Sequence, residues 1–546
     1  ARELAPGKKE DQDFVDARLM LRTGRIEEGI RLLEPMNSEV EDSRGVRPQR
    51  FHREATLLLS LFHAFKGEAE KSRQYAEKGL ELGQTLRSGF VSSVGKMRLG
   101  HALQLGGERW LGGSLKRIQE YYEDSIREVD IVRIHVEPLW GLCRLFGFAG
   151  MLEEARQVGN EGLNIANSAG DTWIGVLIHL SLGASLALAG EYEAASQELS
   201  QAESMASAVL DDLSLTAAHL WQAYTANKQG YGNSAAVYME QALESIAAHG
   251  YEFLLTKASI LGSDDPVDFV PLLLLARRDG LYPELVDKLL KGHGVGEGML
   301  YHPGYTLRLR TLGPLEVYLG RKQVEADAWK RGKSRQLLGL LAGAGQKGLT
   351  REQVGTMLWP EADAPTAANN FKVVLNALNQ VLEPDRPSGE PAYFVARRGD
   401  SYLLNPEASL TLEQRLFEEE AHKNSAHGRA RAFNLYRGRF LEGEPAQEWF
   451  PQEEAYFHRL YLEAADKLIA GALESGDWEQ ALAWCDALLR QDPLYEPAYG
   501  YQMRAYAAQG NLAMARQVYR QAQQALGRGY GGMSPALEQL AEQLLD

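Results

Sequence analysis

A Gly332-Lys333-Ser334 triplet stands in the second half of the 546-residue chain, within DAWKRGKSRQLLGLL. Lysine and serine after a glycine hold phosphate and Mg²⁺ in nucleotide-binding P-loops. Such a loop also needs a glycine five positions before the second glycine, where this chain has Asp327. A carboxylate there repels phosphate, and the residues before it do not form a buried strand. We therefore predict that this triplet hydrolyses no nucleotide.

Other catalytic and metal-binding patterns are also missing from the sequence. The twelve histidines are scattered, with no His-x-x-x-His or Cys-x-x-Cys spacing and no Gly-x-Ser-x-Gly elbow. Of the two cysteines, Cys143 lies in the apolar stretch WGLCRLFGF and is interpreted as a core thiol, and Cys485 is far away in sequence. We predict a protein that is not an enzyme, has no metal or cofactor, and works in the reducing cytoplasm.

The cations around the triplet suggest a different use, contact with a DNA backbone. The whole chain has a net charge of −16, which by itself argues against nucleic acid. Between Tyr305 and Asn405, however, 14 lysines and arginines face 10 acids, so this segment carries about +4 and the rest about −20. Such a separation of sign is expected when one module alone meets phosphate.

A predicted helix over 364–383 carries the residues best suited to read bases. Its apolar side chains follow helical spacing and form a buried stripe: Phe371, Val374, Leu375, Leu378, Val381 and Leu382. The opposite face has asparagines and a glutamine, whose paired donors and acceptors match adenine in the major groove, and Lys372, which suits guanine or phosphate. Exposed asparagines lower helix propensity, which favours a binding role over a merely solvated face.

A basic hairpin follows, with Arg397 and Arg398 placed to grip the neighbouring backbone or minor groove. The full set of predicted DNA-binding residues is Lys330, Arg331, Lys333, Arg335, Arg351, Thr366, Asn369, Asn370, Lys372, Val373, Asn376, Asn379, Gln380, Arg397 and Arg398.

The elements that position these residues form a predicted winged helix-turn-helix over 305–406. TLRLRTLGPLEVYLGRKQVE alternates apolar and polar residues around glycine turns, which predicts a small antiparallel meander. Three helical stretches and the hairpin AYFVARRGDSYLLN follow. Thr350 and Gln353 have the spacing of a capping box at the start of the second helix, and Pro360 ends it.

Residues 1–300 contain one repeated unit, which consists of a helix, a glycine turn and a second amphipathic helix. The turn glycines recur about every 40 residues, at Gly24, Gly67, Gly107, Gly150, Gly190 and Gly230. Helix pairs of this kind cannot bury their apolar faces alone and stack into a superhelix. The insertion EVEDSRGVRPQR is expected to form a loop on one face. The fold class is therefore mainly α, with a tetratricopeptide-like superhelix before the winged helix.

A second repeat domain is predicted over 407–546, with the 34-residue tetratricopeptide period. Gly476 and Gly510 are 34 residues apart, as are Ala481 and Ala515, and Pro493 follows the helix that contains Ala481. The aromatic residues of both repeat regions are expected to pack between helices: Trp140, Trp173, Trp221, Trp478 and Tyr519. We find no secretory signal and no apolar run of about eighteen residues, so no membrane is predicted.

The order of parts resembles bacterial transcriptional activators of the SARP type, which join a winged helix to a bacterial transcriptional activator domain. The resemblance rests on LRTLGPLEVYLG, LTREQVGTMLWP, ANNFKVVLNALNQVLEP, VARRGDSYLLNP, LYRGRFLEG and GDWEQALAWCDALLRQDP, spanning about Thr306 to Asp546. The N-terminal repeats look like the sensor superhelix of MalT-like regulators, in which a STAND NTPase module usually precedes the repeats. We see no such module, so the chain is either a fragment or a regulator without that switch.

The resemblance implies a cytoplasmic activator that binds double-stranded DNA at repeated half-sites and contacts RNA polymerase, and a homodimer on DNA is expected to match such half-sites. A small-molecule or protein effector in the N-terminal superhelix would supply the signal. Two alternatives stay open. One is a protein-interaction scaffold with a DNA-inactive winged helix, and the other is a second-messenger or sugar receptor controlling the same winged helix.

Overall fold

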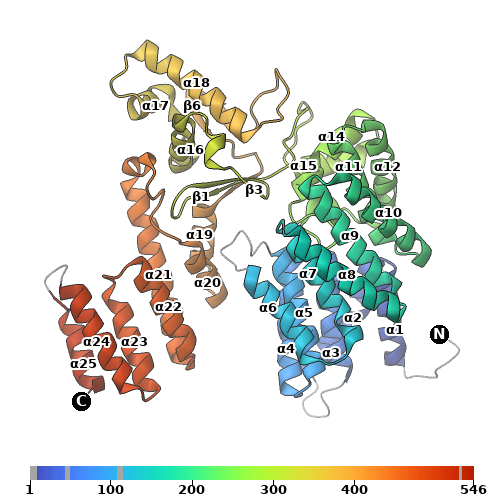
Figure 1. Ribbon diagram of the computed structural model, residues 1–546, viewed down its shortest axis with the longest axis horizontal. Coiled ribbons are helices and arrows are strands. Elements are labelled where there is room, and N and C mark those ends of the chain that lie inside the picture. Colours follow the sequence, from blue (N-terminus) through green and yellow to red (C-terminus); the bar gives the residue numbers. More distant parts are fainter. Residues whose placement is uncertain (1–8, 43–49, 107–114, 528–531, 546) are drawn as a thin grey trace. The chain divides into compact units, whose positions relative to one another are not determined.

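The computed structural model describes residues 9–42, 50–106, 115–527 and 532–545. They divide into two compact units (Figure 1). Unit 1 contains 1–306 with the short segments 385–393 and 407–409, and unit 2 contains 307–384, 394–406 and 410–546. The three-domain division expected from the sequence stays a prediction.

Unit 1 is a stack of antiparallel helix pairs, as the repeats predict. Its main helices are α1 (Lys9–Arg22), α2 (Ile26–Asp42), α3 (Arg50–Phe65), α4 (Ala69–Thr85), α5 (Gly89–Leu105), α6 (Leu115–Glu128), α7 (Val136–Phe148), α8 (Leu152–Ala169), α9 (Thr172–Ala189), α10 (Tyr192–Val209), α11 (Asp212–Lys228) and α12 (Gly232–His249). The short α13 (Phe253–Thr256), α14 (Val270–Arg278) and α15 (Pro283–Gly292) follow.

The repeat works through two small residues at a fixed spacing. The turn glycines adopt a left-handed backbone, as at Gly150 (φ 82°) and Gly190 (φ 87°), which a side chain would strain. Five positions after the turn glycine, Ala155, Ala195 and Ala235 are fully buried. A methyl group at that point lets the two helices of neighbouring pairs approach closely. Gly107 and most of the predicted loop insertion lie outside the described residues.

The large aromatic residues of unit 1 pack between helices, as expected. Trp140, Trp173 and Trp221 are buried, and Trp221 meets Phe269 edge-on with ring centroids 5.1 Å apart. In unit 2, Trp478 and Tyr519 are half-buried.

The expectation that no apolar run is long enough to cross a membrane is corrected by α9. Its 18 residues pass that test by length and composition, but 78% of the window is buried inside unit 1. Burial of this extent is typical of a core helix in a helical repeat, and α9 packs against α7, α8 and α10.

Unit 2 begins with the predicted meander, β1 (Leu307–Arg310), β2 (Glu316–Leu319) and β3 (Lys322–Gln323), paired antiparallel. A fourth strand, β7 (Leu410–Leu412), pairs parallel to β1, so the sheet has the order β3-β2-β1-β7 and is mixed rather than purely antiparallel. The sequence pattern missed β7 because three residues show no alternation to recognise.

The winged helix contains α16 (Gly332–Ala344), α17 (Arg351–Leu358) and α18 (Ala364–Leu382), with the hairpin β5 (Val395–Arg398) and β6 (Ser401–Leu404). The two-residue β4 (Leu349–Thr350) pairs with β6 and completes a small antiparallel sheet. The predicted capping box is present: the Gln353 amide donates to Thr350 Oγ1 (3.2 Å), and the Thr350 amide donates to Gln353 Oε1 (2.8 Å).

The C-terminal part of unit 2 is a second array of helices: α19 (Glu413–His422), α20 (Ala426–Leu435), α21 (Pro451–Ser475), α22 (Trp478–Gln491), α23 (Glu496–Ala508), α24 (Leu512–Gly527) and α25 (Pro535–Leu545). Gly476 and Gly510 have φ values of 78° and 74°, and Ala481 and Ala515 are fully buried. These are the positions that the 34-residue period predicts. Within unit 2, α18 lies at the end remote from α24 and α25 (Figure 1).

Candidate nucleic-acid interface

Helix α18 presents one polar stripe to solvent. Asn369, Lys372, Val373, Asn376 and Gln380 are all exposed, and their spacing of three or four residues places them on one face. Asn370 and Asn379 are half-buried at its borders, and the Asn379 Oδ1 atom is buried without a hydrogen-bond partner. The exposed stripe is therefore narrower than the face expected from the sequence, with five residues in place of seven.

The buried face of α18 fixes this stripe in place. Phe371, Leu378 and Leu382 have almost no exposed surface, and the Phe371 ring meets Tyr402 of β6 with centroids 4.7 Å apart. Leu375 and Val381, which the sequence assigns to the same buried stripe, are only half-buried. Burying each large apolar side chain contributes about 1.5–3 kcal/mol, so the helix cannot rotate without exposing its core.

Helix α18 begins at a side-chain cap. The Asp363 Oδ1 atom accepts a hydrogen bond from the backbone amide of Thr366 at 2.9 Å. The Thr366 side chain and this backbone amide together lower the pKa of the Asp363 carboxyl. Pro365 stands in the first turn, where its missing amide proton costs nothing. Thr366 is exposed next to the polar stripe.

The hairpin between β5 and β6 carries Arg397 and Arg398, and both are exposed. The turn depends on Gly399, with φ 61°. Arg397 Nε donates to the Gly399 carbonyl at 2.9 Å, and its guanidinium pairs with Asp400 at 3.4 Å. Exposed ion pairs of this kind contribute about 0–1 kcal/mol, so the guanidinium can exchange Asp400 for another anion at little cost.

A groove of about 750 Å³ joins the hairpin to the helices. Its walls come from α17, the first two turns of α18 and the β5–β6 turn, and they bring Arg351 and Arg397 to the same depression. Glu352 and Asp400 line it as well. Sequence reasoning missed these two carboxylates, which moderate the positive charge of the groove, because no spacing pattern places them together.

The four cations at the start of α16 separate into two groups. Lys330 and Arg331 are exposed. Lys333 is half-buried, and its ammonium donates to the Leu358 carbonyl at 3.0 Å, at the end of α17. This contact satisfies an otherwise unpaired helix C-terminus.

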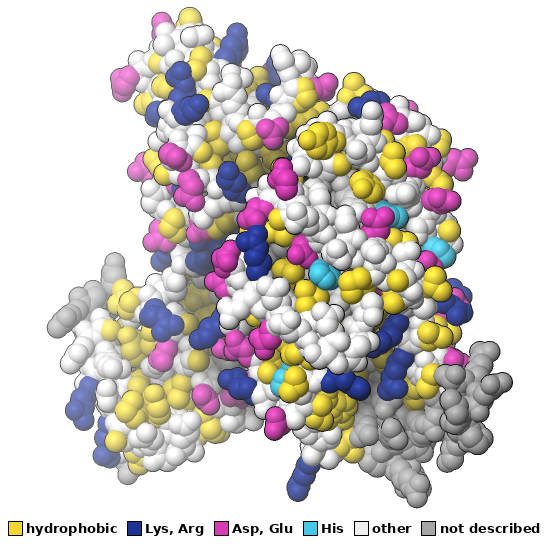
Figure 2. Space-filling view, turned by 45° about the vertical axis from the view of Figure 1, so that its right-hand side comes forward, with side chains coloured by type: hydrophobic (Ala, Val, Ile, Leu, Met, Phe, Trp, Pro, Cys, Tyr) yellow, Lys and Arg dark blue, Asp and Glu magenta, His cyan; other side chains and the backbone are white. Residues whose placement is uncertain are grey.

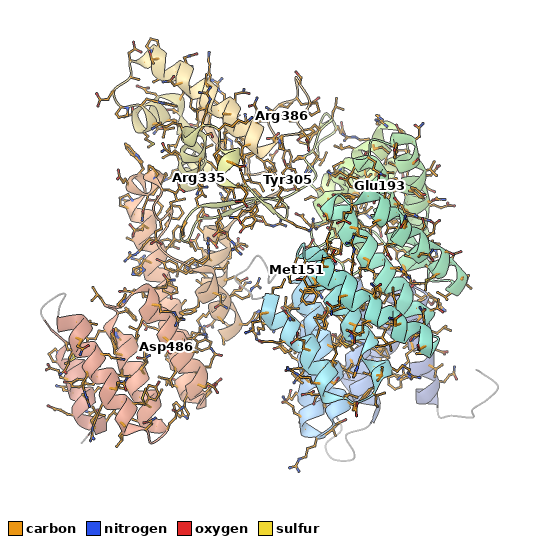
Figure 3. The ribbon with its side chains drawn as sticks, in the orientation of Figure 1. Met151, Glu193, Tyr305, Arg335, Arg386 and Asp486 are labelled. Carbon is orange, nitrogen blue, oxygen red and sulfur yellow. The ribbon has the colours of Figure 1, made fainter. Side chains whose placement is uncertain are left out.

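Arg335 is engaged inside unit 2 (Figure 3). Its guanidinium donates to Glu444 Oε1 at 2.6 and 3.0 Å and to the Leu315 carbonyl at 2.6 Å. Breaking a partly buried arrangement of this kind leaves Glu444, whose side chain is 14% exposed, without its cation. The Arg335 guanidinium therefore has its partners inside unit 2, and the sequence prediction that it contacts DNA is corrected.

The Gly332-Lys333-Ser334 triplet forms the first turn of α16. A short 3₁₀ turn over Ala326–Ala328 precedes it where a P-loop requires a strand, and Ser334 Oγ donates to the Arg331 carbonyl at 2.6 Å. The lysine and the serine both serve the protein's own backbone. This agrees with the prediction that the triplet is not a nucleotide site.

Metal-ligand clusters and cysteine thiols give no reactive group in the part of the chain that the structure describes. No group of three or more histidine, cysteine or acidic side chains there could hold a metal ion. Burial raises the pKa of the Cys143 thiol far above its usual value and that of Cys485 to about 12. Neither thiol is therefore a thiolate near neutral pH, as a nucleophile would need to be.

Comparison with known proteins locates one family within the chain. Residues 407–545 match the model of the bacterial transcriptional activator domain. A search of curated proteins found no match.

Several solved structures match parts of this chain at low identity. EmbR of Mycobacterium tuberculosis, in complex with a low-affinity phosphopeptide, is 21% identical, with a TM-score of 0.35. The match covers 44% of this chain and 65% of EmbR, so this chain spans less than two thirds of that protein. A Rap protein in complex with competence and sporulation factor is 12% identical, with a TM-score of 0.37, over 85% of this chain and 99% of its own. Aspartyl phosphate phosphatase F from Bacillus subtilis is 10% identical, with a TM-score of 0.29, over 84% and 94%.

Proposed function

We propose that this chain, whose residues 407–545 match the bacterial transcriptional activator domain, is a sequence-specific, DNA-binding transcriptional activator of the SARP type. The winged helix over 305–406 binds double-stranded DNA. The domain over 407–546 supports it and contacts RNA polymerase, and the repeats over 1–300 receive a small-molecule or protein signal. Homodimers on DNA would match repeated half-sites.

The observation that carries this proposal is the exposed amide stripe of α18. An asparagine in a helix interior is less favourable than alanine, so exposed asparagines on one face call for a reason other than stability. Asn369, Asn376 and Gln380 can each pair with an adenine edge, and Lys372 between them can reach guanine or phosphate.

Cations flank the stripe and would position it on the duplex. We assign Arg397 and Arg398 to the backbone or minor groove beside α18, and Arg351 to the phosphates nearest the start of α17. Lys330 and Arg331, both exposed, have the same role at the start of α16. Phosphate contacts fix the register of a protein on DNA, and base contacts select the sequence.

The test is retention of genomic DNA fragments by the full chain across a salt series. The variant combines Lys372→Ala, Asn376→Ala and Arg398→Ala, and the control combines Lys467→Ala, Arg504→Ala and Gln523→Ala. Both remove two exposed cations and one exposed amide from unit 2. Each lost phosphate contact reduces the slope of log affinity against log salt by about 0.9, so the first variant should lose up to about two from the slope and the control nothing.

Equal affinity and slope in the two variants would contradict the proposal. A chain that retains no DNA even at low salt but binds a protein partner in a salt-insensitive way would instead be the interaction scaffold described above.

A further inference from the structure

A cavity of about 520 Å³ lies within unit 1, between α1, α3, α5, the segment 133–137 and the start of α9. This volume falls within the range of small-molecule sites. Four arginines line it, Arg18, Arg22, Arg98 and Arg133, together with two acids, Glu137 and Asp171. The lining therefore has a formal surplus of two positive charges.

Each of the two acids is already paired with one arginine. Arg98 is 6% exposed, forms an ion pair with Glu137, and donates through Nε to the Leu57 carbonyl at 3.2 Å. Burial lowers the pKa of Arg98 to about 9, which leaves it charged near neutral pH. Arg22 pairs with Asp171 at 2.9 Å and lies over the Trp173 ring, 5.1 Å from its centroid.

Arg133 is an exposed cation of the cavity lining. It stands in the 3₁₀ turn Val132–Ile134 and is exposed. Phe90, also in the lining, is 51% exposed, an unusual state for a large aromatic side chain. An exposed guanidinium and an exposed aromatic ring in one cavity lining offer a contact to a charged group and one to an apolar group.

The rest of the lining is apolar. Leu57, Leu58, Val94, Met97 and Ile174 form the walls, with the Trp173 ring among them. A wall of this composition excludes water from whatever lies against it, which strengthens any charge pairing inside. The occupant that fits is an anion with an apolar body.

The charge surplus is a property of this cavity and not of the whole unit. On the face drawn in Figure 2, acidic and basic side chains are interspersed. A second cavity, beside Tyr251, is lined by Arg25 against Glu27, Glu28 and Asp212, and a third, beside Tyr238, has Glu193 as its charged residue. Both of these favour cations or neutral ligands.

We propose that the arginine-lined cavity binds a small organic anion, a carboxylate, sulfonate or phosphate on an apolar or aromatic body, and that this is the effector site of the repeats. The effector role rests on the proposed function, whereas the binding chemistry does not. The anionic group contacts Arg133 and Arg22, and the apolar body lies against Trp173 and the aliphatic wall.

The test uses 8-anilinonaphthalene-1-sulfonate as the probe and its uncharged analogue N-phenyl-1-naphthylamine as the chemical control. Fluorescence titrations are run on the full chain and on Arg133→Glu. The matched variant is Arg117→Glu, an exposed arginine of α6 that does not line the cavity. Far-ultraviolet circular dichroism checks that both variants fold.

We expect saturable binding of the sulfonate, weakened roughly tenfold or more by Arg133→Glu, since a hydrogen bond to a charged group contributes about 1.5–3 kcal/mol. Arg117→Glu should leave it unchanged, and the uncharged analogue should not distinguish the two variants. The proposal would be overturned if both variants bound the sulfonate with equal affinity. It would also be overturned if Arg133→Glu weakened binding of the uncharged analogue as much as binding of the sulfonate.

Binding of the probe and retention of DNA are separate readouts. Loss of DNA binding with an intact sulfonate site contradicts the proposed function alone. If Arg133→Glu leaves sulfonate binding unchanged in a chain that still binds DNA, only the proposed anion site in the cavity is contradicted.

Discussion

Replacing Asn369 and Asn376 by alanine should change helix stability and DNA affinity in opposite directions. Both side chains are exposed on the same face of α18, seven residues apart, and neither forms a side-chain hydrogen bond with another residue that the structure describes. Alanine is the most favourable helix residue and asparagine is about 0.6 kcal/mol worse, so the double variant should stabilise α18 by about 1 kcal/mol. Each lost base contact costs about 1–3 kcal/mol.

The affinity for selected genomic sites should therefore fall at least about thirtyfold, which corresponds to about 2 kcal/mol. Hydrogen exchange of peptides from α18 measures the stability, and filter retention at fixed salt measures the affinity. Asn160→Ala with Asn164→Ala is the matched control, because these asparagines are exposed on α8 of unit 1.

Two results would refute this reasoning. If the α18 variant exchanged more slowly but bound the same sites with unchanged affinity, the asparagines would not read bases. If hydrogen exchange in α18 became faster in the variant, any loss of DNA binding would come from a destabilised helix. The assumption that the polar face of α18 does not contribute to stability would then be wrong.

Two further predictions concern stability. Glu413→Ala should destabilise unit 2 by about 3–5 kcal/mol, because Glu413 is buried, accepts from the amides of Thr311 (2.7 Å) and Leu312 (2.8 Å), and pairs with Arg437 at 3.3 Å. Denaturant unfolding measures the loss, which should be smaller in Glu413→Gln, and equal losses would contradict the ionic role. In unit 1, burial raises the pKa of Glu68, but His63 Nδ1 at 2.8 Å and Lys66 Nζ at 3.2 Å outweigh it and lower the pKa to about 2. A carboxyl whose pKa is lowered by folding stabilises the protein fully above its unfolded pKa of 4.5 and loses this contribution as the pH falls toward 2. The difference in unfolding midpoint between wild type and Glu68→Gln should therefore narrow between pH 4.5 and 2. A difference that stays constant over this range would contradict the predicted role of Glu68.

The repeats and the winged helix could be predicted because their signals are local. A turn glycine with a small residue five positions later, as at Gly190 and Ala195, needs only one helix pair to be recognised. The capping box at Thr350 and the buried stripe through Phe371 likewise depend on neighbours three or four residues apart. Helical periodicity is a property of the chain itself, so it survives whatever the helix packs against.

Only the tertiary structure decided which charged residues form ion pairs inside the protein and which stay exposed to a ligand or to DNA. Arg335 and Glu444 are 109 residues apart, and no sequence pattern in either segment predicts that they form an ion pair. The four cavity arginines come from three separate segments, α1, α5 and the turn Val132–Ile134, and each looks in sequence like an ordinary surface charge. Charge pairing depends on distance in space, and the stacking of helices sets those distances only after the chain has folded.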